Sequence, residues 1–305
     1  MNGGEKVPTL DPRRIAIIGF GEVGGIFARD LIASGRHDVA AYDILLDDAE
    51  SAPRLRDKAR TLHVTACASA AEAASGALVA ISAVTAASAL AVAEAAARFL
   101  APGQLFLDVN SVSPDTKRAA AQAVERSGAH YVEAAVMAAV VPYGLKVPIL
   151  LGGRQARAIR DLLTPAGMVL EVAAAEIGKA SATKMSRSIV MKGLEALIVE
   201  CLYTARHYGV EDAVLASLGK TYPGLDWEKL GGYWLGRVIE HGRRRAAEMR
   251  ESAATVAETG IEPLMAMAIA GRQDWLANRA AEQPALKSAK DENWRATLDV
   301  IAGRQ

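Results

Sequence analysis

The sequence contains few cysteines: Cys67 and Cys201 are the only two among 305 residues. Two cysteines so far apart along the chain do not form the disulfide framework of a small secreted domain. We therefore predict a reducing, cytoplasmic location. No spacing of cysteine or histidine matches a metal site, and no serine lies in the strand–turn–helix context of a nucleophile elbow. The sequence thus predicts neither a bound metal nor serine-hydrolase chemistry.

The chain also lacks net charge, since Lys and Arg together number 35 and Asp and Glu together number 35. Without an excess of one sign, no long-range field attracts nucleic acid or an anionic membrane surface. We expect the partner to be a small molecule or a second copy of the chain. The first 14 residues, MNGGEKVPTLDPRR, lack an apolar signal core, and we interpret them as a short disordered lead-in.

A strongly apolar membrane span is missing as well. The segment 76–93, GALVAISAVTAASALAVA, is uncharged for long enough to raise the question. It consists mostly of Ala, Ser and Thr, and alanine contributes little transfer energy. Because Val and Ile are concentrated in its first part and Ala in its second, we predict a buried strand, a turn at Thr85 and a helix.

What the chain does have is size and apolar content. With 305 residues, 51% of them hydrophobic, it exceeds the length at which a single core keeps growing. In the first half, short apolar runs alternate with Ala-rich helical stretches, which is typical of a parallel sheet covered by helices on both faces. We predict a doubly wound α/β domain over residues 1–177. Its strands are expected at 14–18, 38–42, 62–65, 77–83, 104–109 and 129–133, with KVPILLGG and GMVLEVAA flanking a helix around 157–163 and extending the sheet.

Strand signals stop after Gly178. The remaining chain, residues 178–305, is predicted to form an all-helical domain that begins with a long interdomain helix. Helix breaks are expected at YPG (222–224), GG (231–232) and TGIEP (259–263), where Gly and Pro interrupt the helical pattern.

The first chemical motif is GFGEVG, residues 19–24, which follows an apolar strand and opens a helix. Gly19 permits a tight turn, Gly21 lets a pyrophosphate approach the backbone, and Gly24 lets the helix pack close to the strand. The helix N-terminus then faces the phosphates. The strand, the helix and an acidic residue downstream together predict dinucleotide binding in a Rossmann-type domain.

The acidic residue is Asp43, which ends the next strand, 24 residues after Gly19. Its carboxylate is placed to accept hydrogen bonds from the ribose hydroxyls of NAD and to repel the 2′-phosphate of NADP. We therefore predict NAD as the cofactor. Because Arg54 and Arg56 lie in the following segment and carry the charge to bind a phosphate, NADP stays possible.

The second motif is DVNSVSP, residues 108–114, at the end of the fifth strand. Ser113 is expected to cap the following helix, with Pro114 in its first turn. Asn110 and Ser111 fall at the carboxyl end of a sheet strand, where doubly wound folds bind ligands. A polar loop without a ligand uses the same residue types, so both interpretations stay open.

Together with the fingerprint, the segments DVNSVSP, VEAAVMAAVVP, GKASATKMSRS and HGRRRAAEMRESAATVAETGIEP resemble the β-hydroxyacid dehydrogenases over almost the whole chain. This family includes the 3-hydroxyisobutyrate and 6-phosphogluconate dehydrogenases and, more distantly, imine reductases. The resemblance implies a dinucleotide-binding domain joined by a long helix to an all-helical domain. It also implies oxidation of a hydroxyl β to a carboxylate, with a lysine on the joining helix as general acid/base.

The family's catalytic pattern, G-x-G-x-x-x-K-x-x-N-N, corresponds to residues 178–188, with Lys184 at the lysine position. Ala180 replaces the second glycine, and Arg187 and Ser188 replace the two asparagines. The family's substrate loop, D-A-P-V-S-G-G, corresponds to residues 133–139, where Met137 occupies the position of a substrate-binding serine. These differences predict a substrate that is larger or more apolar than the family's smallest ones.

The chemistry supports Lys184 independently. Hydride transfer from a carbinol carbon requires the hydroxyl proton to leave, and a lysine with a lowered pKa accepts it. Burial in an apolar helix and repulsion from Arg187 are both expected to lower the pKa of Lys184. Arg187 itself is suited to hold a substrate carboxylate by two parallel hydrogen bonds. The alternative is that Lys184, Arg187 and Lys192 all extend to solvent; we favour it for Lys192 and leave it open for Arg187.

Other positions have weaker support. His241 lies among the arginines 243–245 and has the chemistry to donate to a substrate, although a surface basic cluster is the more common explanation. Glu248 takes the position of an acidic residue near the family's active site, but Ala247 replaces its lysine partner. An aromatic group either lines an apolar substrate pocket or packs at a helical interface: Tyr222, Trp227, Tyr233 and Trp234.

The sequence therefore predicts a site with Lys184 as the catalytic residue. The substrate is expected to contact Asn110, Ser111, Met137, Arg187, Ser188 and His241. The cofactor is expected to contact Gly19, Phe20, Gly21, Glu22, Val23, Gly24, Asp43, Val84, Thr85 and Asn110.

From these residues we predict an NAD(P)-dependent dehydrogenase that transfers a hydride between a nicotinamide cofactor and a 3-hydroxy acid or a related primary or secondary alcohol. We expect a homodimer or higher homo-oligomer, without a nucleic-acid or membrane partner. Two alternatives stay open. One is an imine or ketone reductase, against which the lysine counts, and the other is a dinucleotide-binding protein without turnover.

Overall fold

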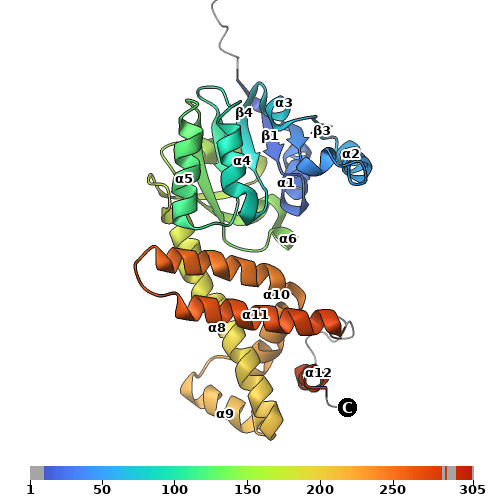
Figure 1. Ribbon diagram of the computed structural model, residues 1–305, viewed down its shortest axis with the longest axis vertical. Coiled ribbons are helices and arrows are strands. Elements are labelled where there is room, and N and C mark those ends of the chain that lie inside the picture. Colours follow the sequence, from blue (N-terminus) through green and yellow to red (C-terminus); the bar gives the residue numbers. More distant parts are fainter. Residues whose placement is uncertain (1–9, 284–285, 287–292, 304–305) are drawn as a thin grey trace, which may run out of the picture. The chain divides into compact units, whose positions relative to one another are not determined.

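The computed structural model describes residues 10–283, 286 and 293–303 of the chain (Figure 1). These residues form two compact units, one ending at Lys184 and the other beginning at Met185. Each unit has its own hydrophobic core. The division falls within helix α8 (Lys179–Tyr208), which begins one residue after the predicted start of the helical domain.

The first unit contains an eight-stranded sheet in the order β3-β2-β1-β4-β5-β6-β7-β8. All neighbouring strands are parallel except β6 and β7, which are antiparallel. The winding reverses between β1 and β4, and ligands of doubly wound folds bind outside the carboxyl ends of the strands at such a point. The strands are β1 (Asp11–Ile18), β2 (Asp38–Tyr42), β3 (Thr65–Ala66), β4 (Ala77–Ser82), β5 (Leu105–Asp108), β6 (His130–Val136), β7 (Pro148–Gly152) and β8 (Val169–Ala174).

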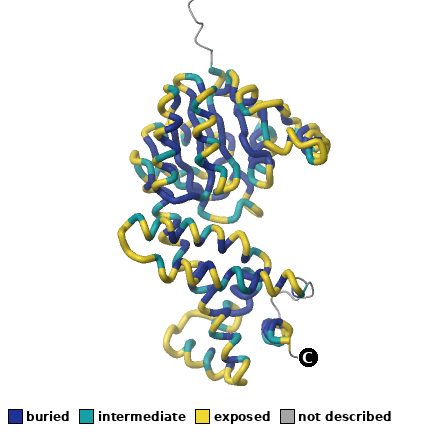
Figure 2. Tube along the Cα trace, in the orientation of Figure 1, coloured by how far each residue is buried: buried dark blue, intermediate teal, exposed yellow. Residues whose placement is uncertain are grey.

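Helices cover both faces of this sheet, because successive side chains of a strand point to opposite sides. Ile15 and Ile17 of β1 pack in one cluster with residues of α1 and α7, whereas Ala16 and Ile18 pack in another with residues of α3, α4 and α5. Figure 2 shows the resulting burial of the strands. The helices are α1 (Glu22–Ala33), α2 (Ala52–Thr61), α3 (Ala70–Ala74), α4 (Ala89–Ala96), α5 (Pro114–Glu125), α6 (Val140–Tyr143) and α7 (Ala156–Leu163).

The doubly wound sheet confirms the predicted fold class, but the strand predicted at 62–65 is misplaced, because β3 comprises only Thr65 and Ala66, which pair with β2. Leu62 ends α2 with its N–H directed to the carbonyl of Lys58, and His63 follows with a φ of 56°. Leu62 and Val64 are apolar because they pack against the core from the end of a helix. Because His63 lies between them, the segment has the apolar–polar alternation that is typical of a strand.

Two other predictions concern segments beside β1. The predicted disordered lead-in is wrong for residues 11–14, which belong to β1, while residues 1–9 lie outside the described residues. Segment 76–93 forms β4, a turn and the start of α4, as predicted, with Thr85 preceding the 3-10 turn η2 (Ala86–Ser88). In the described part of the chain, no helix is both long and apolar enough to cross a membrane.

The second unit consists of the greater part of α8 followed by α9 (Glu211–Thr221), α10 (Trp227–Ala257), α11 (Leu264–Glu282) and α12 (Trp294–Ile301). The breaks predicted at 222–224 and 259–263 are confirmed. The break predicted at 231–232 is wrong, because α10 continues through both glycines. A Cβ on Gly231 would lie 2.8 Å from Cδ1 of Leu202, so this glycine allows α10 to pack closely on α8.

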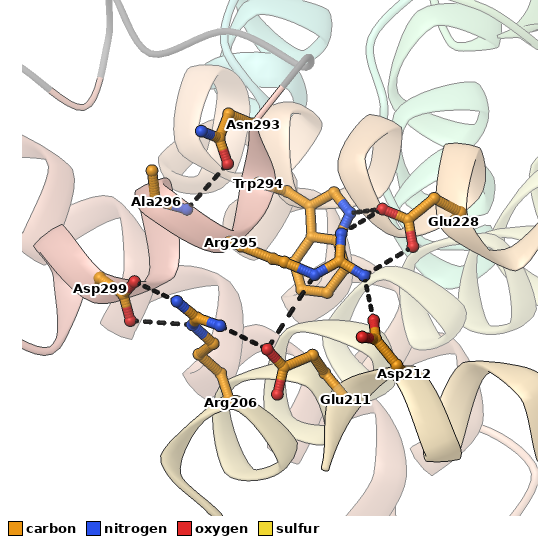
Figure 3. A network of polar contacts seen from close by, with 9 residues as sticks. All are labelled: Arg206, Glu211, Asp212, Glu228, Asn293, Trp294, Arg295, Ala296 and Asp299. Carbon is orange, nitrogen blue, oxygen red and sulfur yellow. Dashed lines mark hydrogen bonds and ion pairs between the residues drawn. The ribbon is translucent and has the colours of Figure 1, made fainter. Parts of the chain in front are cut away.

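Ion pairs attach α12 to the rest of the second unit (Figure 3). Arg206 of α8 donates to both carboxylate oxygens of Asp299, over 3.0 and 2.6 Å. Arg295 of α12 bridges Glu228 of α10 and Asp212 of α9. Both arginines are partly exposed, so the two-pronged geometry stabilises these contacts more than burial does.

A buried polar cluster joins three helices of this unit. Glu195 of α8 and Arg245 of α10 are 3% and 6% exposed and share two hydrogen bonds, of which Nε to Oε2 measures 2.6 Å. Gln273 of α11, fully buried, donates Nε2 to the same Oε2 over 3.3 Å. Removing one partner from such a pair leaves the other charge buried without compensation.

Arg245→Met should therefore lower the free energy of unfolding by about 3–5 kcal/mol. The double variant Arg245→Met with Glu195→Gln should recover much of that loss, because no charge then remains in the cluster. Chemical denaturation followed by circular dichroism measures both values. If the double variant is no more stable than Arg245→Met, the uncompensated Glu195 carboxylate is not the cause.

Candidate functional site

The fingerprint glycines differ in what surrounds them. Gly19 has a φ of 94°, and a Cβ there would overlap the carbonyl oxygen of Ala83. A Cβ on Gly24 would overlap the carbonyl of Gly19, which shows how closely α1 approaches the end of β1. At Gly21, by contrast, no described atom outside the glycine and its two chain neighbours lies within 4 Å of the position of a Cβ. The open space beside Gly21 fits a pyrophosphate at the N-terminus of α1.

Asp43 lies against this turn. Its Oδ2 accepts the N–H of Phe20 over 2.6 Å, and its Oδ1 accepts the N–H of Leu45 over 3.0 Å. Each carboxylate oxygen has a further lone pair, so both can still accept a ribose hydroxyl. Glu22 is exposed at the first position of α1, whereas Val23 packs against the core.

Asn110 ties the carboxyl ends of β4 and β5 together. Its Oδ1 accepts the N–H of Val84 over 2.7 Å, and its Nδ2 donates to Oγ of Ser82 over 2.9 Å. Val84 lies beside the fingerprint, since a Cβ on Gly19 would be 2.8 Å from its Cγ1. Asn110 thus holds the loop of Val84 and the exposed Thr85 next to the dinucleotide turn.

A buried charged group supports Asn110. Asp108 accepts the backbone N–H of Asn110 on Oδ1 (2.9 Å) and the hydroxyl of Tyr131 on Oδ2 (2.5 Å). The ammonium of Lys117 lies 3.1 Å from Oδ1. Burial, and then the negative charge of Asp108, raises the pKa of Tyr131 well above its usual value, so the phenol stays a proton donor. This network fixes the end of β5 and the orientation of Asn110.

The neighbouring serines have different roles. Ser111 has a hydroxyl oxygen that is shielded from solvent and makes no hydrogen bond to any described residue. Because buried hydroxyls normally have a partner, this oxygen is a candidate contact for a ligand. Ser113 caps α5, as predicted, with its Oγ 3.3 Å from the N–H of Thr116.

Glu133 is a fully buried acid in β6 and caps the N-terminus of α8. Its Oε1 accepts the N–H groups of Gly178 (2.7 Å) and Ala180 (3.1 Å). Its Oε2 accepts the N–H of Ser181 (3.3 Å) and the hydroxyl of the same residue (2.8 Å). A Cβ on Gly152 would overlap this carboxylate, which explains why β7 has a glycine opposite it. The first turn of α8 is thereby fixed to the sheet.

Lys184 follows this capped turn on α8 and is half-buried. Gly178, with a φ of 101°, precedes the helix, and a Cβ there would lie 3.4 Å from the Cβ of Pro114. The starts of α8 and α5 are therefore adjacent. Within the first unit, the fold thus brings the GKASATK segment next to the DVNSVSP segment that contains Asn110 and Ser111.

The other predicted substrate residues lie in both units. Met137, after β6, belongs to the first unit with Lys184, and its N–H donates to the carbonyl of Pro148 over 2.9 Å. Arg187 (exposed), Ser188 (buried) and His241 belong to the second unit. Burial lowers the pKa of His241 more than Glu240 raises it, which favours the neutral imidazole.

The prediction that Lys192 extends to solvent is wrong, because Lys192 is buried and pairs with Glu248. Nζ of Lys192, 6% exposed, lies 2.9 Å from Oε2 of Glu248 and donates to Oγ of Ser188 over 3.1 Å. Burial lowers the pKa of Lys192, against the opposing effect of Glu248. Because an ammonium only donates, the hydroxyl hydrogen of Ser188 can point to another acceptor.

Sequence reasoning also missed Lys58 and the capping role of Glu133. The ammonium of Lys58 on α2 donates hydrogen bonds to the carbonyls of Phe20 (2.8 Å) and Gly21 (2.7 Å) in the fingerprint turn. In the sequence, the one feature that indicates this role of Lys58 is an additional glycine, Gly25, directly after the fingerprint. The signal for Glu133 is a lone acid inside an apolar strand. Over the residues that the structure describes, no group of three or more His, Cys, Asp or Glu side chains is placed to hold a metal ion.

The first unit has the strand, glycine turn, helix and carboxylate of a dinucleotide-binding domain. Residues 14–173 match the NAD binding domain of 6-phosphogluconate dehydrogenase, which is more than half of the chain. Residues 205–276 match a domain of unknown function, DUF1932. The chain therefore belongs to the β-hydroxyacid dehydrogenase family, and its cofactor is NAD(P).

Solved structures are similar over most of the chain. A conserved hypothetical protein from Sinorhizobium meliloti 1021 is 38% identical, with a TM-score of 0.82 and 97% of each chain covered. MTH1747, a conserved protein of unknown function with structural similarity to 3-hydroxyacid dehydrogenases, is 35% identical, with a TM-score of 0.72 and 88% of this chain and 98% of that chain covered. The 3-hydroxyisobutyrate dehydrogenase of Mycobacterium tuberculosis shares the fold at 20% identity, with a TM-score of 0.68 and coverage of 95% and 99%.

A curated relative matches over a shorter range. An uncharacterized 28.5 kDa protein of Methanothermus fervidus is 27% identical over 165 residues. The match spans 53% of this chain and 61% of that protein.

Asp43→Asn should narrow the difference in affinity between NAD(H) and NADP(H) by roughly tenfold, or about 1.4 kcal/mol. The amide oxygen can still accept the N–H of Phe20, but the charge that repels a 2′-phosphate is gone. Fluorescence titration with NADH and NADPH measures the ratio. Asp57→Asn, an exposed acid on α2, is the control and should leave it unchanged. Tighter binding of NADPH than NADH by the unmodified protein would contradict this role of Asp43.

Proposed function

We propose that the protein is an NAD(P)-dependent dehydrogenase that acts on a 3-hydroxy acid or a related alcohol, with Lys184 as general acid/base. The observation that carries this proposal is the capped start of α8. Four hydrogen bonds to the buried Glu133 carboxylate fix the first turn of the helix on which Lys184 lies. A general base needs such a fixed position to come within hydrogen-bond reach of a substrate proton.

The free thiols of Cys67 and Cys201 support the proposed cytoplasmic location.

The nicotinamide, when bound, supplies the hydride acceptor for oxidation and the donor for reduction. The chain's own residues manage the proton and the substrate. In oxidation, neutral Lys184 accepts the proton of the substrate hydroxyl, and in reduction its ammonium returns that proton. Ser111, whose hydroxyl makes no hydrogen bond to any described residue, is suited to a polar substrate atom. Arg187 on α8 is suited to the substrate carboxylate.

The loop after β6 supports a larger or more apolar substrate than the smallest hydroxyacids. Met137 is half-buried at its start, and Ala138 and Ala139 follow it. A methionine side chain offers a flexible apolar surface where a serine would offer a hydroxyl. We therefore propose aliphatic or aryl 3-hydroxy acids as the substrate class to screen with NAD⁺ and NADP⁺.

Lys184→Ala should lower the rate of the chemical step by about 10²- to 10⁴-fold, the usual contribution of a positioned proton-transfer group. The affinity for NADH should stay nearly unchanged, because the dinucleotide turn is built from other residues. Single-turnover kinetics and NADH titration measure the two quantities. Lys179→Ala is a matched control, since Lys179 is an exposed lysine on the first turn of the same helix.

Full activity of Lys184→Ala, on a substrate that the unmodified protein turns over, would show that Lys184 is structural. The pH profile gives a second measurement. The rate of oxidation should rise with pH as Lys184 loses its proton, and this rise should be absent in the alanine variant.

We also propose that the protein is a homodimer. The second unit exposes large apolar side chains on α8 and at the start of α11, including Val190, Leu197, Leu264, Met265 and Met267. Val190 and Leu197 are seven residues apart and therefore lie on one face of α8, and an exposed apolar helix face is typical of a subunit interface.

Sedimentation at micromolar concentration should accordingly give about twice the chain mass of 32.1 kDa. Leu197→Glu should shift the distribution toward the monomer, because burying a carboxylate at an interface is unfavourable. A single species at the mass of one chain in the unmodified protein would rule out the dimer at that concentration.

A further inference from the structure

Gly25 has no role in the G-x-G-x-x-G fingerprint that precedes it. It lies inside α1, where glycine is less stable than alanine by about 1 kcal/mol. Its surroundings explain its presence: a Cβ there would overlap Nζ of Lys58 and lie 2.6 Å from Cε of the same side chain. Gly25 therefore leaves the space that the end of Lys58 occupies.

The ammonium of Lys58 is held at the dinucleotide turn by three contacts. It donates to the carbonyl of Phe20 (2.8 Å) and to the carbonyl of Gly21 (2.7 Å), and it lies 4.5 Å from the centroid of the Phe20 ring. The N–H of the same residue, Phe20, donates to Asp43. Both backbone groups of Phe20 are thus held, the carbonyl by a cation and the N–H by a carboxylate.

These contacts matter for a phosphate ligand in two ways. Carbonyl oxygens carry partial negative charge, and the Lys58 ammonium offsets the charge of two of them next to the N-terminus of α1, where the pyrophosphate binds. A turn that is already fixed also loses less conformational entropy when the ligand binds. Both effects act on the part that NAD(H) and NADP(H) have in common.

We propose that Lys58 is a positioning residue for the dinucleotide and that Gly25 is required to admit it. Lys58 holds the β1–α1 turn in the conformation that receives the pyrophosphate and raises the affinity for NAD(H) and NADP(H) by the same factor. The choice between the two cofactors stays with the groups at the ribose, among them Asp43. Gly25 and Lys58 act as one unit, although they lie on different helices.

The test uses the full chain and four variants: Lys58→Met, Lys58→Ala, Gly25→Ala and the double variant Gly25→Ala with Lys58→Ala. Lys58→Met removes the ammonium and keeps an apolar stem, whereas Gly25→Ala keeps the lysine and displaces its ammonium. Each single variant should raise the dissociation constants of both NADH and NADPH by about tenfold, the effect of losing hydrogen bonds to a charged group. The double variant should bind both cofactors no more weakly than Lys58→Ala alone. In the double variant no lysine side chain is left for the added methyl group at position 25 to displace.

Arg60→Met is the charge-matched control, since Arg60 lies on the same helix with an exposed side chain, and it should bind both cofactors normally. Thermal unfolding without cofactor verifies that each variant is folded under the binding conditions. If Gly25→Ala does not fold, Lys58→Met and the double variant, in which the overlap is removed, still test the proposal.

Three results would overturn the proposal. Unchanged affinity of Lys58→Met for both cofactors would show that the ammonium does not support the turn. A loss confined to NADPH would make Lys58 a direct contact of the 2′-phosphate instead. If the losses of binding free energy in Gly25→Ala and Lys58→Ala add up in the double variant, Gly25 and Lys58 act independently.

Discussion

The buried carboxylate of Glu133 is the interaction on which the site of the first unit depends. An acid without solvent exposure is stable only when its charge is compensated, and here the start of α8 supplies three N–H groups and a hydroxyl. The positive end of the helix dipole adds to this compensation. Because Glu133 belongs to the sheet, the acid and the helix stabilise each other in one relative position.

The contact between Glu133 and the start of α8 restricts which residues can lie next to it. Gly152, opposite Glu133 in the sheet, has no room for a side chain. Gly178 turns the chain into α8 with a positive φ, close to Pro114 at the start of α5. The network around Asp108 fixes Asn110 at the adjacent strand end. The buried carboxylates of Glu133 and Asp108 therefore determine where Lys184 and Asn110 lie.

Most of the fold could be predicted because its signals are local. A strand, a glycine turn and a helix occupy consecutive residues, and the ranges of β2 and β4 follow from short apolar runs. The errors come from tertiary contacts. Leu62 and Val64 are apolar because of packing at a helix end, and Gly231 lies inside a helix because α10 packs on Leu202. The antiparallel direction of β7 has no local signal either.

The site divides in the same way. The tight turn at Gly19, the close packing at Gly24 and the cap at Ser113 could be predicted, since each belongs to a motif of consecutive residues. The contact of Glu133 with α8 and that of Lys192 with Glu248 join residues far apart in the chain. No spacing rule in one sequence connects such pairs, so only the fold reveals them.

The fingerprint glycines also differ in what they would tolerate. Gly19 and Gly24 are required by the chain itself, because a side chain at either position collides with its own backbone. At Gly21, by contrast, a Cβ would enter open space, so no collision with the rest of the fold requires a glycine there. The first two therefore serve the folding of the chain, whereas the glycine at position 21 is expected to serve the ligand. A lineage that lost its cofactor would keep the steric reasons for Gly19 and Gly24 but would lose the reason to leave the space beside Gly21 open.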